Sequence, residues 1–68
     1  MKQIVFEVFE PPERGYEASA RGHHIYTQGE DWNDLKAMIQ DAVRCHFGDD
    51  QPPSLIRILY LREEVLAA

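Results

Sequence analysis

The sequence predicts an α+β domain in the order β-β-β-α-β: a three-stranded antiparallel meander, one helix and a fourth strand. Three observations predict this class. Residues 3–9 alternate in the manner of a strand, residues 26–32 place a short strand, a glycine turn and a capped helix in series, and residues 55–61 form a final apolar run. A chain of 68 residues is expected to form a single domain, 1–68.

The first strand is predicted over residues 3–9. Ile4, Phe6 and Val8 share one face and should point to the core, whereas Val5 and Phe9 share the outer face with a glutamate. Two prolines and a glycine in residues 10–15 then break the strand, because proline donates no ladder hydrogen bond and glycine permits a turn.

Residues 16–21 are predicted to form a second strand. Tyr16, Ala18 and Ala20 alternate there with polar residues, and the small alanines leave space for a helix to lie close. After a turn at residues 22–24, a short third strand over residues 25–28 ends at Gly29. The strands are expected to build an antiparallel sheet with the helix on one face.

A helix is predicted from residue 32 to residue 46. Asp31 is the expected N-cap, with Asp34 three residues later as the reciprocal acid of a capping box, and Gly48 is the expected left-handed residue at the end. At 100° per residue one apolar stripe is expected to contain Leu35, Ile39, Ala42 and His46, with Trp32 and Val43 on its shoulder.

The last strand, residues 55–61, is largely apolar on both faces and is therefore predicted to be a well-covered strand. The tail at residues 62–68 is expected to dock on the sheet edge or on a second chain. A sheet with one helix leaves its other face uncovered, so an interface is predicted there. Its residues are Val5, Phe9, Leu59, Leu61, Val65 and Leu66. The alternative is that these are single exposed apolar residues with no function.

Twelve acids oppose seven bases, and the net charge is −5. The bases are dispersed, whereas phosphate binding requires local positive charge, so no nucleic acid is expected as a partner. A basic protein partner suits this charge, since opposite fields select partners and speed encounter. The alternative is that the charge only keeps a small protein soluble.

The sequence predicts no catalytic, cofactor or metal site. His23-His24 and Cys45-His46 are adjacent pairs whose side chains diverge, and they lack zinc-ligand spacing. The first two histidines are interpreted as polar turn residues, His46 as a cap of the helix carbonyls, and Cys45 as a half-buried thiol. The glycines stand singly at turns, so they form no phosphate-binding loop.

The predicted location is the cytoplasm. The chain has one cysteine and therefore no internal disulfide, and its N-terminus has no long apolar run before the first acid, so no secretory signal is expected. No apolar run approaches the roughly 20 residues that cross a bilayer, so no membrane association is expected.

Several short motifs occur in a recognisable order. They are Gly15-Tyr16, Thr27-Gln28-Gly29-Glu30, the helix that begins at Asp31-Trp32 and passes through Val43, Cys45-His46-Phe47, Pro52, Ile56-Arg57 and Arg62-Glu63-Glu64-Val65. In this order the chain resembles the HicB-like antitoxin family, whose members have a "G-Y" turn and a "T-x-G-D/E" turn before the helix. The resemblance covers nearly the whole chain.

The resemblance implies a partial RNase H-like fold and a non-enzymatic antitoxin that masks a small basic RNA-cleaving toxin of the HicA type. It also implies a short stand-alone member, because residues 1–68 contain no counterpart of the C-terminal DNA-binding segment of full antitoxins. Two alternatives stay open. One is a self-associating homodimeric module without a toxin, and the other is a residual nuclease or RNA-binding domain.

Overall fold

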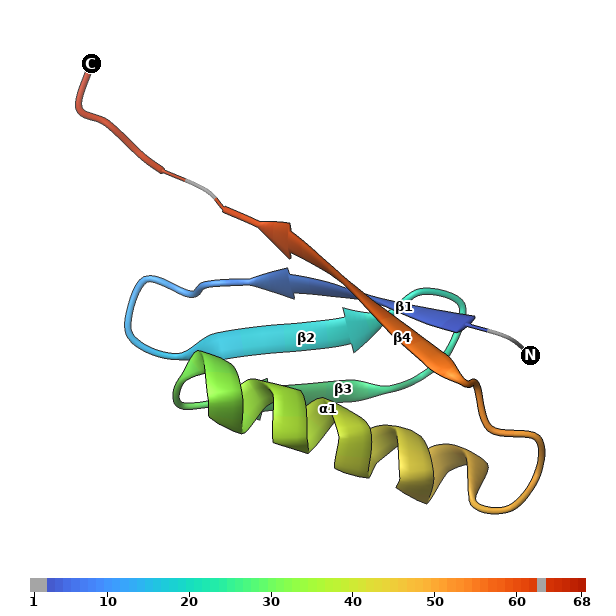
Figure 1. Ribbon diagram of the computed structural model, residues 1–68. Coiled ribbons are helices and arrows are strands. Elements are labelled where there is room, and N and C mark those ends of the chain that lie inside the picture. The colour runs from blue at the N-terminus through green and yellow to red at the C-terminus, as the bar shows by residue number, and fades with distance from the viewer. Residues whose placement is uncertain (1–2, 63) are drawn as a thin grey trace.

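The computed structural model describes residues 3–62 and 64–68. Its elements are β1 (Gln3–Phe9), β2 (Tyr16–Ala20), β3 (Tyr26–Gly29), α1 (Trp32–Phe47) and β4 (Leu55–Leu61). The predicted order β-β-β-α-β is confirmed (Figure 1). The predicted bounds of β1 and β4 are correct, those of β2 and α1 differ by one residue at one end, and β3 is shifted by one residue at both ends.

The four strands form one sheet in the order β3-β2-β1-β4. β1 and β3 both run antiparallel to β2, whereas β4 runs parallel to β1, with Gln3 beside Leu55 and Phe9 beside Leu61. The prediction of an antiparallel sheet is therefore wrong for β4. The meander leaves β3 running in the direction of β1, and α1 returns the chain to the end of the sheet where β1 begins (Figure 1). A strand that starts there next to β1 must run parallel to it.

The core lies between the sheet and α1, which packs over β3 and β2. Its buried members are Ile4, Phe6, Val8, Ala18, Ile25, Leu35, Ile39 and Val43. Ala18 is fully buried, so the expected space for the helix above the alanines is confirmed.

The buried stripe of α1 differs from the predicted one near its C-terminus. Leu35 and Ile39 are buried as predicted, but Val43 completes the stripe and His46 is exposed. The helix is about 24 Å long at 1.5 Å per residue, whereas β3 spans about 13 Å, so the last turn extends beyond the strand that covers it. Cys45 is exposed rather than half-buried, because it lies about 200° around the helix from Val43.

The N-terminus of α1 is capped by Asp31, as predicted. Its Oδ1 accepts a hydrogen bond from the Asp34 backbone N–H at 2.7 Å. The Asp34 carboxylate reaches back to the N–H of Glu30 at 2.9 Å, one residue before the position that a capping box requires. At the other end, Gly48 has φ +58° and ψ −128°, so it has the predicted positive φ but not the predicted left-handed helical conformation.

Two glycines of the short motifs meet where β2 and β3 pair. Gly15 has φ +77°, and a Cβ on it would lie 2.6 Å from the carbonyl oxygen of Gly29. A Cβ on Gly29 would lie 2.6 Å from the Cα of Leu35, the first buried residue of α1. These glycines therefore let the turn before β2, the end of β3 and the start of α1 approach one another.

Aromatic rings close both ends of the core. At one end Tyr16, Trp32 and Tyr60 form a cluster with ring centroids 5.4–6.0 Å apart. At the other end the centroids of the His23 and Phe47 rings are 5.4 Å apart, so His23 is a packing residue as well as a turn residue.

No helix in the described ranges is long and apolar enough to cross a membrane.

Candidate functional site

The face of the sheet that points away from α1 carries the candidate interface. The register sets four side-chain pairs on this outer face, formed by β1 and β4: Gln3 beside Leu55, Val5 beside Arg57, Glu7 beside Leu59, and Phe9 beside Leu61. Four of the predicted interface residues, Val5, Phe9, Leu59 and Leu61, are thereby brought onto one strip, which we call the apolar strip. The only helix of the described chain lies over the opposite face (Figure 1).

The other half of the outer face is polar. Glu17 and Ser19 on β2, with Tyr26 and Gln28 on β3, continue the rows that begin at Phe9 and Glu7. Apart from the exposed ring of Tyr26, the apolar side chains of the outer face therefore lie on β1 and β4. A strip of this kind next to a polar surface has the layout of an interaction surface with a polar rim.

Exposure differs among the predicted interface residues. Phe9 and Leu61 are 41% and 49% exposed, whereas Val5 and Leu59 are half-buried by their neighbours. The side chains of Phe9 and Leu61 line one shallow groove, and Phe9 and Val65 line another of about 450 Å³ together with residues 10–12. Val65 therefore lies next to the apolar strip, and Leu66 does not line either groove.

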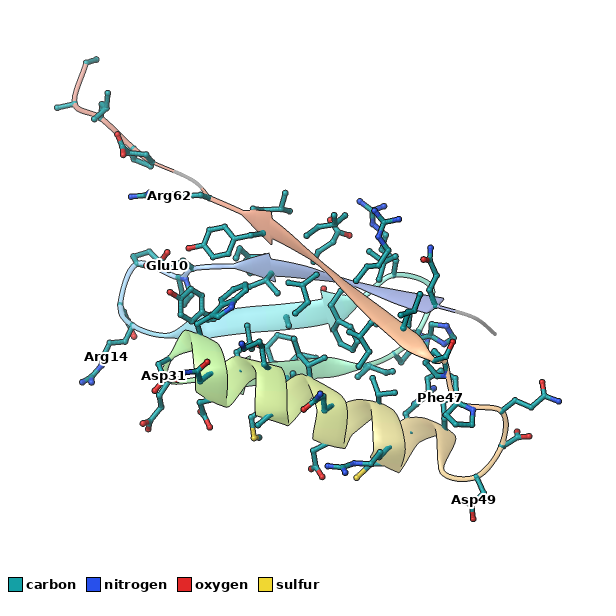
Figure 2. All side chains as sticks on the ribbon, in the orientation of Figure 1. Glu10, Arg14, Asp31, Phe47, Asp49 and Arg62 are labelled. Atoms are coloured by element: carbon teal, nitrogen blue, oxygen red, sulfur yellow. The ribbon has the colours of Figure 1, made fainter. Side chains whose placement is uncertain are left out.

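The tail after β4 does not pack on its own sheet. Val65 and Leu66 are 83% and 78% exposed, and Figure 2 shows the side chains at the end of the tail standing away from the sheet. Of the two expected docking places, the edge of its own sheet is therefore not used. The reason is geometric: β1 ends at Phe9, opposite Leu61, so residues beyond Leu61 have no strand beside them.

Carboxylates surround the apolar strip, and each has a partner. Glu7 forms an ion pair with Arg21 at 3.1 Å, and Glu17 accepts a hydrogen bond from the Tyr26 hydroxyl at 2.7 Å, which raises the pKa of Tyr26. The Tyr60 hydroxyl donates to the carboxylate of Glu10, and this hydrogen bond raises the pKa of Tyr60 to about 12. These three carboxylates are therefore ordered, and Arg21, Arg57 and Arg62 lie in the same region.

The motif residues form a second, smaller feature. Gly15, Tyr16 and Gly29 line an open cleft of about 350 Å³, which also has Arg14 and Glu30 on its walls. Thr27 is buried, and Trp32 is half-buried as a member of the cluster of aromatic rings. Their positions explain the motif as a folding requirement: two glycines that allow close approach, a capped helix start and a ring cluster.

Groups for metal chemistry do not gather in the described part of the chain. No three side chains among its His, Cys, Asp and Glu residues come close enough to form a metal-ligand group. His23 and His46 do approach each other, with ring centroids 5.8 Å apart, but they do so while packing around Phe47.

Sequence reasoning missed part of the exposed apolar surface. Leu55 is 62% exposed and Tyr60 is 40% exposed, and neither was predicted at an interface. Both belong to β4, which lies at the edge of the sheet with β1 as its neighbour. A signal was present, because residues 55–61 are apolar on both faces, but that pattern was interpreted as a covered strand.

Comparison with known proteins identifies relatives over most of the chain. A UPF0150 protein of Thermotoga maritima is 36% identical over 66 residues, which cover 97% of this chain and 93% of the relative. A UPF0150 protein of Archaeoglobus fulgidus is 44% identical over 52 residues, which cover 76% of this chain and 77% of the relative. No family model and no solved structure matches the chain. The length and identity of the first match show that the chain belongs to the UPF0150 family.

Proposed function

We propose that this UPF0150 protein is a non-catalytic protein-interaction module that works like a HicB-type antitoxin in the cytoplasm. In this function it covers the active surface of a small basic RNA-cleaving toxin of the HicA type. The observation that carries the proposal is the apolar strip on the outer face, bordered by ordered carboxylates.

The chemistry of this surface suits a basic protein partner. The apolar side chains of Phe9 and Leu61 can be buried by a partner, and such burial is the main source of association energy. The carboxylates of Glu7, Glu10 and Glu17 lie around them, and the whole chain carries a net charge of −5. A positive partner would therefore be attracted from a distance and oriented on contact.

The fold also supports the proposal. The order β-β-β-α-β is the order that the resemblance to HicB-like antitoxins implies, and the motif turns that carry the resemblance meet in space. Fold alone does not give function, so the weight of the proposal rests on the surface and on a binding experiment.

The experiment is to co-express the chain with a small basic protein encoded next to it, and to measure co-purification and RNA cleavage. We expect a complex in which cleavage is inhibited. Phe9→Glu should weaken the complex at least tenfold, about 1.4 kcal/mol, because it places a charge beside Leu61, where the apolar strip is most exposed.

Met38→Glu is the matched control. Met38 is also 41% exposed, but it lies on α1, on the opposite side of the sheet from the apolar strip. The proposal fails if no basic neighbour binds the chain, or if Phe9→Glu and Met38→Glu weaken the complex equally.

Self-association is the second candidate function, and one observation favours it. Eight large apolar side chains are exposed in the described ranges, and five of them lie on β4 and the tail: Leu55, Tyr60, Leu61, Val65 and Leu66. Such concentration on one segment at the sheet edge points to an interface along that segment.

A further inference from the structure

β4 is a long, unprotected edge strand. Its seven residues pair with β1 on one side, and in the described sheet no strand lies on the other side. About half of the backbone N–H and C=O groups of such a strand point away from its neighbour and can accept another strand. The opposite edge of the sheet, β3, has only four residues. An additional strand therefore has one suitable place to pair.

The sequence of β4 is nearly self-complementary about its central residue, Ile58. If a second β4 runs antiparallel with Ile58 opposite itself, Leu55 lies opposite Leu61, and Ile56 lies opposite Tyr60. Residues directly opposite in an antiparallel pair point to the same face, so these apolar pairs make contact. The remaining residue pair is Arg57 with Leu59.

Other registers are less favourable. Moving the two-fold axis to Arg57 places two arginines directly opposite each other, and like charges in that position are destabilising. Moving it to Leu59 shortens the overlap of the two strands. The axis at Ile58 keeps all seven residues of β4 paired.

We propose that the free edge of β4 binds β4 of a second copy of this chain, antiparallel about Ile58, and so joins two sheets into one. The occupant is a second copy because the interface of a two-fold dimer must be complementary to itself, and β4 has this property. This dimer rests on the proposed function as an interaction module. Its sheet edge binds the second copy, and its outer face binds the basic partner.

Apolar side chains lie along the edge that would be paired. Leu55, Tyr60 and Leu61 are 62%, 40% and 49% exposed, and in this arrangement the tail with Val65 and Leu66 continues past the start of the partner's β4. Pairing covers the sides of the strand residues that face the second copy and leaves their outer surfaces open, so backbone hydrogen bonds along the seven residues of each strand supply much of the contact.

The arrangement leaves the apolar strip free for another protein. A two-fold axis perpendicular to the sheet keeps both copies of α1 on one face and both strips on the other. Phe9 and Leu61 of one copy and their equivalents in the second would then belong to one continuous outer face. A dimer formed in this way can still bind a basic partner.

Charge exchange across the pair of Leu55 and Leu61 tests the register. Leu55→Lys alone and Leu61→Glu alone should each raise the dissociation constant of the dimer at least tenfold, because each places an unpaired charge against a leucine in both Leu55–Leu61 pairs of the dimer. The double variant should restore the constant to within about threefold of the wild type, because it places opposite charges face to face. The two positions are about 20 Å apart within one strand, so restoration cannot arise inside one chain.

Analytical ultracentrifugation of the purified chain measures these constants, and circular dichroism checks that each variant is folded. Met38→Lys adds the same charge on α1 and should leave the dimer unchanged. If the single variants do not fold, hydrogen exchange of the wild type gives the answer: amides of β4 should gain protection as the protein concentration rises across the dimer transition.

The inference is wrong if the wild-type chain stays monomeric at millimolar concentration, or if neither single variant changes the dissociation constant. It is also wrong if the double variant dimerises as weakly as the single variants, or if the exchange rates of the β4 amides do not depend on protein concentration. A dimer lost only in Phe9→Glu would assign self-association to the outer face instead. Because no toxin is present in these measurements, their failure leaves the antitoxin proposal to its own experiment.

Discussion

Gly15 and Gly22 have the same backbone conformation but different surroundings. Both have a positive φ, +77° and +75°, which L-residues other than glycine rarely adopt. A Cβ on Gly15 would collide with the backbone of Gly29, whereas a Cβ on Gly22 would meet nothing within 4 Å. Only Gly15 therefore has both a conformational and a steric requirement.

The two glycines make a matched pair of substitutions. Gly22→Ala should lower the free energy of unfolding by about 1 kcal/mol, from the positive φ alone. Gly15→Ala should lower it by about 1–3 kcal/mol more, because the added methyl group must push apart the backbones of the two turns. Urea denaturation measures both values, and equal losses would show that the contact with Gly29 has no cost.

Tyr60 provides a pH-dependent contact at the end of β4. Its hydroxyl donates a hydrogen bond to Glu10, and the neighbouring carboxylate disfavours the phenolate, which raises the pKa to about 12 from the ordinary 10.0. Because the folded-state pKa is the higher one, the stability from this contact is present in full below pH 10. It is lost as the pH rises through about 12.

Glu10→Ala should return the pKa of Tyr60 towards 10, since it removes both the hydrogen-bond acceptor and the negative charge. The chemical shift of the tyrosine Cζ carbon, followed by NMR against pH, measures the change. Tyr26 is the internal control, because its pKa is raised by Glu17 and should not respond. A Tyr60 that already titrates near 10 in the wild type would contradict the assigned hydrogen bond.

At the scale of elements, α1 is the part of the fold that local sequence specifies most fully. Asp31 caps its first turn, and three buried residues spaced four apart face the sheet. Two basic residues, Arg44 and His46, lie in its last turn. Acid at the start and base at the end both complement the helix dipole. A substitution at the cap should therefore change the free energy of unfolding directly.

Removal of the cap gives the prediction for this element. Asp31→Ala should lower the free energy of unfolding by about 1 kcal/mol, because the N–H of Asp34 loses its acceptor at the helix end. Asp41→Ala is the control: it removes an exposed acid of the same helix whose ion pair with Arg44 is long, at 3.8 Å. Thermal denaturation compares the two, and a loss as large for Asp41→Ala would argue against a capping role.

At the scale of the whole molecule, the crossover to β4 decides which surfaces remain open. Placing β4 next to β1 extends the apolar outer face, and it also leaves β4 itself as the sheet edge. One connection thus produces both surfaces on which the proposals rest. The edge is assigned to a second copy and the outer face to a basic partner. The two contacts share only Leu59 and Leu61, whose sides face the second copy and whose outer surfaces stay on the open face.

The sequence by itself determined the local structure of this protein. Alternation specified β1, an apolar run specified β4, and Asp31 specified the helix start. Phe9 and Leu61, two of the predicted interface residues, are exposed on the outer face. These features depend on residues close in the chain, whose periodicity and hydrogen bonding are visible in the sequence.

Only the tertiary structure decided that β4 runs parallel to β1, that the strand forms an edge, and that Val43 rather than His46 completes the buried stripe. Each of these depends on which segments far apart in the chain become neighbours. The sequence of an apolar strand is similar whether the strand lies in the centre of a sheet or at its edge. The pattern shows that both faces are apolar, but it does not show which segment covers them.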